Sequence, residues 1–305
     1  ELEGDAGAKA PAHCSQVFRD SGVAVLRDGW HREASTMVLD FGRCIGGHAY
    51  PARSTFCLWL RGRPAALSPG SFISYSNPLS RGWCHTTRSQ NTVWVDDLDQ
   101  EQWVTPGEER VQGEITRWEE GAESVLVQGR HDGYLPNAGI RHTRTVMMAN
   151  GLFIVHDALD ATQASESRTG RWSLHCPEPW RSADSGSRAM TAPDLMRVVP
   201  AWPEAIQDVE TGSEGISAYP GISEDGTTGA YRRLNQMRYR FGIEKGSVTH
   251  FAAVIVADCG SEEDVPQIAR ATIAAKGLQL SVRRRGTEET FHLPLLPEPI
   301  CKPPQ

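Results

Sequence analysis

The residue types best suited to chemistry gather between positions 39 and 100, where histidine, tyrosine and arginine alternate with glycine. His48 follows two consecutive glycines, which permit a sharp turn that would project its imidazole from a loop. An imidazole titrates near neutral pH, so it can act there as a base or as an acid. An ordinary surface histidine would have the same local sequence, and this alternative stays open on the residues alone.

The elements that must position these side chains are short strands that frame three irregular segments. The segments run over 42–53, 68–77 and 77–90. Loops at one end of a β-sandwich can converge into a cleft. We therefore expect the functional site where these three segments meet.

Short runs with strand composition recur along the chain, mostly separated by glycine, proline, asparagine or aspartate. They lie at 22–27, 36–41, 55–60, 92–96, 111–118, 124–128, 141–148, 152–156, 170–175, 188–191, 231–241, 248–257, 278–284 and 290–293. Asn150-Gly151 predicts a tight hairpin turn. Only 262–275 could form a helix, and Pro266 counts against it. The sequence predicts an all-β fold, a large antiparallel two-sheet β-sandwich with very little helix.

The expected domain organisation is simple. Residues 1–13 have no apolar period, which indicates a flexible leader. Residues 14–305 are expected to form the β-sandwich domain, with a possible small β-subdomain from about residue 240. No repeat of fixed period stands out, and strands do not alternate with long helices as a parallel sheet requires.

Composition limits the partners. A net charge of -7 disfavours nucleic acid, because phosphate binding needs a basic field. Arginine outnumbers lysine by 27 to four, and the planar guanidinium binds carboxylate or sulfate bidentately, although a GC-rich genome would explain the same ratio. No apolar run approaches the roughly 18 residues that a membrane span needs, and no signal segment is visible, so no membrane partner is expected.

The seven cysteines contain no CxxC pair, and an odd number leaves at least one thiol outside any disulfide. A cysteine-rich zinc site is therefore not expected. We predict buried small hydrophobic side chains and no disulfide framework.

The order of several motifs resembles a known family. The segment 39–100 contains GGH, a Pro-Gly loop, Tyr75, an aromatic-rich stretch, NTVWVD and then DQ. The stretches IRHTRTVMMANGLFIVHDAL at 140–159 and RWSLHCP at 171–177 continue the likeness, which covers about 18–177. Together they resemble the C-terminal β-domain of the heparinase II/III-like (alginate lyase-like) polysaccharide lyase superfamily, and the order is more specific than any one motif.

The resemblance implies a function. It implies the β-domain of a polysaccharide lyase, acting by β-elimination on acidic, uronic-acid-containing polysaccharides such as glycosaminoglycans or alginate, in a periplasmic or secreted location. In the family a helical toroid domain precedes the β-domain and supplies the catalytic tyrosine, and this sequence has no candidate for it. We therefore expect the isolated chain to be inactive. The alternative is a noncatalytic carbohydrate-binding or assembly module derived from the family.

The sequence also departs from the family pattern. Where members carry the second His of GHGHxD, the Asp of DPG and the His of AHN, which can bind a structural zinc, this chain has Tyr50, Ser68 and Gln90. Tyrosine, serine and glutamine are poor zinc ligands beside histidine and carboxylate. We expect no zinc and no other cofactor.

Uronate elimination needs a cation to neutralise the carboxylate, a base for the C5 proton and an acid for the leaving oxygen. The expected catalytic residues, from the resemblance and from their types, are His48, Tyr50, Tyr75 and His85. The expected substrate-binding residues are Arg81, Trp83, Arg88, Asn91, Gln100 and Trp103.

Two blander alternatives stay open. Trp83, Trp94 and Trp103 could be core or rim aromatics and not sugar contacts. The run Arg283-Arg284-Arg285-Gly286 predicts a hairpin tip, which could attract sulfate or be a solvated turn.

Overall fold

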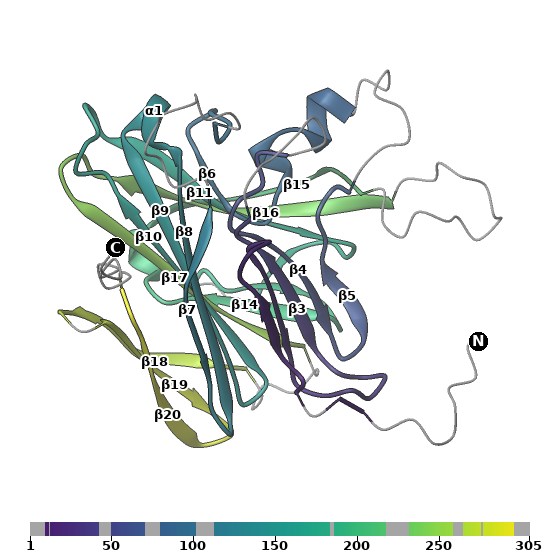
Figure 1. Ribbon diagram of the computed structural model, residues 1–305. Coiled ribbons are helices and arrows are strands. Elements are labelled where there is room, and N and C mark those ends of the chain that lie inside the picture. Colours follow the sequence, from purple (N-terminus) through teal and green to yellow (C-terminus); the bar gives the residue numbers. More distant parts are fainter. Residues whose placement is uncertain are drawn as a thin grey trace, which may run out of the picture.

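The computed structural model describes residues 10–11, 13–42, 50–70, 80–101, 113–183, 186–217, 232–258, 265–275 and 277–295. Every strand pairing in them is antiparallel, and the strands form three layers (Figure 1). The predicted all-β antiparallel sandwich with very little helix is confirmed.

The central layer is an eight-stranded sheet. Its order is β12 (Arg181–Ser182), β13 (Met190–Ala192), β14 (Met196–Pro200), β17 (Val248–Ala257), β10 (Leu152–Asp160), β9 (Ile140–Ala149), β8 (Ser124–Tyr134) and β7 (Glu114–Glu120).

The second layer joins two smaller sheets edge to edge. One has the order β1 (Gln16–Phe18), β2 (Val23–Arg27), β3 (Thr36–Asp40), β4 (Thr55–Leu60) and β5 (Arg63–Ala66). The other has the order β15 (Ile206–Ser217), β16 (Arg232–Ile243), β11 (Arg168–Cys176) and β6 (Val93–Val95). The amide of Leu67, just after β5, donates to the carbonyl of His175 in β11 at 3.0 Å, so the two sheets form a nearly continuous layer.

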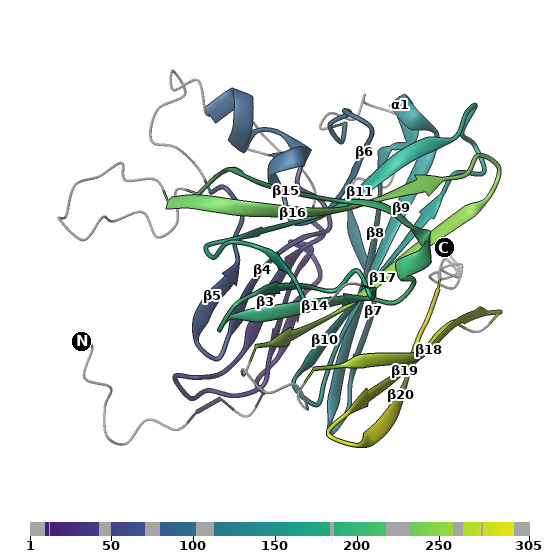
Figure 2. The ribbon, with the colours of Figure 1, turned by 180° about the vertical axis from the view of Figure 1, so that it is seen from behind.

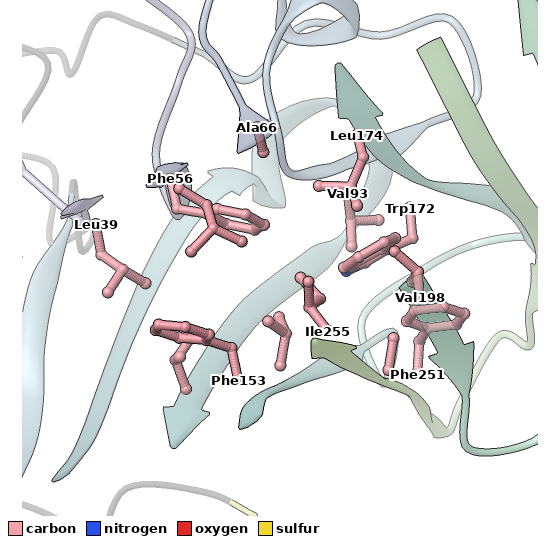
Figure 3. Packing of buried hydrophobic residues seen from close by; sticks show 14 of the residues in the cluster. Leu39, Phe56, Ala66, Val93, Phe153, Trp172, Leu174, Val198, Phe251 and Ile255 are labelled. Carbon is pink, nitrogen blue, oxygen red and sulfur yellow. The ribbon is translucent and has the colours of Figure 1, made fainter. Parts of the chain in front are cut away.

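The main core fills the space between these two layers. Figure 3 shows Phe56 of β4 facing Phe153 of β10, and Trp172 of β11 beside Phe251 of β17. The rings of Trp172 and Phe251 lie 5.3 Å apart between centroids. These side chains are almost fully buried, because alternate residues of each strand face the opposing sheet.

A three-stranded sheet covers the other face of the central layer. It comprises β18 (Gln267–Ala274), β19 (Gly277–Arg284) and β20 (Thr287–Leu293), yellow in Figure 1. Leu280 of β19 packs in a second core together with Ile154 of β10 and Val254 of β17. The strands of this small sheet begin at Gln267, and β16 and β17 belong to the two larger layers.

Two turn predictions are confirmed and the single helix prediction is wrong. Asn150 and Gly151 have φ of 50° and 73° between paired residues of β9 and β10. Arg285 and Gly286 form the equivalent tip of β19 and β20. The stretch 262–275, expected as a possible helix, contains β18, because pairing with β19 places it over the second core.

The described helices are short. They are α1 (Leu135–Ala138), the π-helical turn η1 (Ser80–Cys84), and the 3₁₀ turns η2 (Thr87–Ser89) and η3 (Pro203–Ala205). Among the described residues, no helix has the length and apolar content needed to cross a membrane.

Candidate functional site

Two chain segments carry the described candidate residues. The first, 50–54, leads into β4; the second, 80–92, contains η1 and η2 and leads into β6. They meet at Tyr50 and His85, whose ring centroids are 4.4 Å apart with an interplanar angle of 45°. Both side chains are half-buried. The structure therefore brings together two predicted catalytic residues from separate segments.

Thr87 of η2 links the two segments through hydrogen bonds. Its side-chain hydroxyl donates to the carbonyl of Pro51 at 2.9 Å and accepts from the amide of Gln100 at 2.9 Å. The Thr87 amide donates to Oδ1 of Asp99 at 2.6 Å. Thr87 is fully buried, so this hub fixes the backbone on both sides of the Tyr50–His85 contact.

Trp83 and Arg88 lie on the β15 side of this segment. Trp83 is 6% exposed, its indole N–H donates to the carbonyl of Ile216 at 2.9 Å, and its ring meets the edge of His175 at 5.6 Å. Arg88 is exposed, with its guanidinium 5.7 Å from the Trp83 ring centroid. Trp83 thus anchors η1 against β15, as the core-or-rim alternative expected, while Arg88 faces the surface.

Asn91 and Gln100, both expected to bind substrate, are buried and bonded internally. The Asn91 amide donates to the carbonyl of Phe56 at 2.8 Å, and its oxygen accepts from the His175 backbone at 2.8 Å. The Gln100 side chain bonds both the amide (2.9 Å) and the carbonyl (3.1 Å) of Arg53. Their observed contacts are those of positioning residues, because no polar atom of either side chain faces a surface.

A buried ion pair supports both segments from below. Arg144 of β9 and Asp157 of β10 are fully buried, and Nε and the second guanidinium nitrogen of Arg144 reach the two carboxylate oxygens at 2.7 and 2.9 Å. The remaining guanidinium nitrogen donates to the carbonyls of Ser54 (2.5 Å) and Asn91 (2.8 Å). One side chain therefore holds the ends of both segments.

Arg144 and Asp157 are not among the site residues expected from the sequence. The signal was present in RHTR and VHD, the parts of 140–159 that resemble the family's HxR strand and following hairpin. The sequence does not show that two backbone carbonyls, those of Ser54 and Asn91, converge on Arg144.

Two histidines extend this buried network. Nδ1 of His131 accepts the Gly133 amide at 3.1 Å, so its Nε2 carries the proton and donates to Nδ1 of His142 at 3.0 Å. Nε2 of His142 then donates to Oδ1 of Asp157 at 2.6 Å. Burial lowers the pKa of both histidines, and Arg144 and His142 hold the pKa of Asp157 far below its usual range against its own burial. The two histidines are therefore neutral, and they bond to the charged pair of Arg144 and Asp157.

The remaining predicted residues cannot be placed. His48, Tyr75 and Trp103 lie outside the described residues, as does the side chain of Arg81.

The three positions where the family can bind zinc do not fit that ion. Tyr50 contacts His85 through its ring, and the Gln90 amide is buried, donating to Ser89 Oγ at 3.2 Å and more weakly toward the Cys84 carbonyl. No cluster of three or more histidine, cysteine or acidic side chains suited to a metal occurs within the described ranges. The donor set here is tyrosine, serine and amide, which zinc disfavours.

Comparison with known proteins gives concordant matches. The model of the family "Heparinase II/III-like, C-terminal" matches residues 10–241. A heparin-sulfate lyase of Bacteroides stercoris is 24% identical over 96% of this chain and 42% of its own length. A heparin-sulfate lyase of Pedobacter heparinus is 28% identical over 55% of this chain and 24% of its own length. The chain thus spans less than half of these relatives.

Solved structures share the fold. A mutant heparan sulfate lyase from Pedobacter heparinus aligns with a TM-score of 0.75 at 19% identity, over 94% of this chain and 43% of that one. A heparinase III aligns with a TM-score of 0.71 at 18% identity over the same shares. Together with the family match over more than half of its residues, these findings show that the chain belongs to the heparinase II/III-like C-terminal domain family.

Proposed function

We propose that this chain is the β-domain of a polysaccharide lyase that cleaves uronic-acid-containing polysaccharides by β-elimination, and that it requires a helical toroid domain to do so. The observation that carries the proposal is the contact between Tyr50 and His85 at 4.4 Å, at the meeting point of two loop segments. Family membership and the printed activity of the curated relatives, heparin-sulfate lyase, support the same reaction class.

The reaction needs three functions, and the described residues offer candidates for each. Arg88, exposed three residues after His85 and packed over Trp83, suits neutralisation of the uronate carboxylate, which makes the C5 proton more acidic. Tyr50 and His85 are hydrogen-bonding groups of the kind that take the C5 proton or protonate the leaving O4. The C4–O bond breaks as the C4–C5 double bond forms, so the proton lost and the proton gained balance. His48, Tyr75 and Arg81 are proposed to complete this site.

A second candidate function is a binding module without chemistry. The observation that favours it is the replacement of all three metal positions by Tyr50, Ser68 and Gln90, with Gln90 bonded internally. Such a module would keep Arg88 and the aromatic residues for glycan binding and lose the elimination step.

The experiment follows two signals from the purified chain. Ultraviolet absorbance detects the unsaturated uronate product over heparan sulfate, chondroitin and alginate, and calorimetry measures binding of oligosaccharides from the same polymers. We expect weak, salt-sensitive binding and no detectable elimination, because an acid and a base on one domain cannot enclose the sugar alone.

Two variants test whether the acidic oligosaccharide binds near His85. His85→Ala should weaken binding several-fold, whereas His292→Ala, on the exposed side of β20, should leave it unchanged. Robust elimination by the chain alone would contradict the need for a toroid domain. Failure to bind every acidic glycan would defeat the proposed site.

A further inference from the structure

The outer face of the sheet β15-β16-β11-β6 concentrates arginine side chains. In β11, Trp172 and Leu174 point into the main core, so Arg171, Ser173 and His175 point outward. Register places Arg240 opposite Arg171, and Arg238 opposite Ser173. Trp94 of β6 lies opposite Arg171 on the other side. We call Arg171, Arg238, Arg240, Trp94 and Ser173 the outer arginine face.

Three arginines on this face meet the carboxylates of Glu210 and Asp208, and a further acidic residue, Glu214, also acts on Arg238. Nε of Arg171 lies 3.3 Å from Glu210, and Nε of Arg240 lies 4.0 Å from the same carboxylate. Arg240 also reaches Asp208 at 3.7 Å. For Arg238, the contacts on the described face are with the neutral Gln236 amide oxygen at 2.8 Å and with the carbonyl of Arg88 at 3.5 Å.

The arginines are held close together in spite of their repulsion. Arg171 and Arg238 both lie over the ring of Trp94, at 5.0 and 5.4 Å from its centroid. Burial lowers the pKa of Arg238, and Arg171 and Arg88 lower it further, while Glu210 and Glu214 act in the opposite direction. A cation–π clamp thus fixes two guanidinium groups in a region where a further anion would relieve their repulsion.

Buried polar atoms lie beneath the same cluster. Oγ of Ser173 is buried without a hydrogen-bond partner among the described residues. Nε2 of His175 is also unbonded, but Nδ1 of that ring donates to Oδ1 of Asn91, so Nε2 is an acceptor and does not bind an anion. Nε of Arg238 and Nε of Arg240 likewise lack a hydrogen-bond partner among the described residues, although Nε of Arg240 is within ion-pair distance of Glu210. Ser173 and His175 are 1% and 0% exposed, and they lie beside Arg238 and Gln236 in the register. Guanidinium N–H donors are costly to leave unbonded, so the arginines of this face suit an acceptor with several oxygens.

The face is continuous with the candidate site. The carbonyl of Arg88 in η2 accepts from Arg238, and Trp83 of η1 bonds the backbone of β15 through Ile216. The two short helical turns accordingly lie over β15 and β16 in both views (Figure 1, Figure 2).

We infer that the outer arginine face is a second anion-binding subsite, which takes the sulfate or carboxylate group of an acidic oligosaccharide through Arg171 and Arg238. The inference rests on the proposed function, because the ligand is the same glycan extended past Arg88 along β16. Guanidinium groups suit this role because they offer paired donors to planar or tetrahedral oxyanions.

The first test is the double variant Arg171→Gln/Arg238→Gln of the full chain, titrated with a heparan sulfate hexasaccharide. Loss of two charged hydrogen-bonding groups should raise Kd by about tenfold or more and flatten its dependence on salt. The matched control Arg283→Gln removes an exposed arginine that is likewise paired, to Glu288 at 2.9 Å, on the distant three-stranded sheet, and should leave Kd unchanged. A loss in the control equal to that in the double variant would overturn the subsite.

A second variant should change Kd in the opposite direction, toward tighter binding, which misfolding would not produce. Glu210→Gln removes the carboxylate that Arg171 and Arg240 share, and it should lower Kd, because the guanidinium groups no longer have an internal anion. NMR of the arginine Nε–H groups should show Arg171 and Arg238 shifting on titration. Unchanged resonances, or an unchanged Kd in both variants, would refute the inference.

Two further comparisons separate the possibilities. A desulfated hexasaccharide of the same length that binds equally assigns the subsite to carboxylate, and one that binds weakly assigns it to sulfate. If His85→Ala weakens binding while Arg171→Gln/Arg238→Gln does not, the subsite is wrong and the proposed function stands. If the unaltered chain binds no acidic glycan, both fail.

Discussion

At the residue scale, one buried arginine holds the ends of both loop segments. Arg144 bonds a carboxylate on one side and two backbone carbonyls on the other, and all of its partners are buried. Breaking such a pair leaves an uncompensated charge in the interior, which is why a geometry of this kind is sensitive to substitution of either partner. The backbone on either side of Tyr50 and His85 thus depends on a side chain that is itself fully buried.

The buried histidines make stability depend on pH. Burial lowers the pKa of His156 and of His175 from an ordinary 6.5 to about 3. In the unfolded chain they bind protons below about 6.5, whereas in the folded protein they do not. The free energy of unfolding is therefore highest above about pH 6.5. It falls as the pH decreases from there toward 3, by about 1.4 kcal/mol per pH unit for each such histidine.

The prediction is that His175→Gln reduces this slope between pH 6 and about 4, whatever it does to stability at pH 7. Urea titrations at several pH values measure the slope directly. The exposed His292→Gln is the control and should keep the slope of the unaltered protein. An equal slope in His175→Gln would show that His175 protonates freely in the folded state.

At the element scale, tight turns set the register of the long strands. Gly151 closes the hairpin of β9 and β10 at φ 73°, and a Cβ added there would meet nothing within 4 Å. Gly139, after α1, has φ 68°, but a Cβ there would lie 2.5 Å from the carbonyl oxygen of Gln163 and 2.7 Å from Cα of Ala164. A comparison of substitutions at the two glycines therefore distinguishes the cost of backbone strain from the cost of steric contact.

Gly151→Ala should lower the free energy of unfolding by about 1 kcal/mol, from left-handed backbone strain alone. Gly139→Ala should lose about 2–3 kcal/mol, because the strain is combined with a contact to rigid backbone. Denaturant midpoints at constant m-value give both numbers. Equal losses would mean that the backbone near Gln163 yields easily.

The strands that were not predicted from sequence also belong at this scale. The sequence of β15 is polar and contains glycine. It forms a strand because β16 pairs with it over most of its length, with two register irregularities. The short β14 lies between β13 and β17, which supply its hydrogen-bonding partners. Such strands are fixed by their neighbours and not by their own propensity.

At the scale of the whole molecule, the central sheet is shared by two cores. Its inner face packs against the second layer, and its outer face packs against β19 and β20. The small β-subdomain expected from the sequence therefore raises the question of whether the three-stranded sheet unfolds alone. Because Ile154 and Val254 contribute to the second core from the central sheet, we expect one cooperative transition.

Leu280→Ala tests this expectation. Leu280 is fully buried, and its truncation should cost about 2–5 kcal/mol. Amide exchange should then rise together in β19, β10 and β17, which provide the walls of the second core. Faster exchange confined to β18–β20 would identify a separately unfolding unit.

The sequence by itself determined the fold class, the hairpin at Asn150-Gly151 and the family, because strand alternation, turn chemistry and motif order are local properties that survive low identity. It also singled out Tyr50 and His85. Only the tertiary structure decided that their rings meet, that Asn91 and Gln100 are enclosed, and that Arg144 holds two distant carbonyls. Those facts depend on which residues converge across layers, and the cross-layer distances that decide them are not encoded by spacing along the chain.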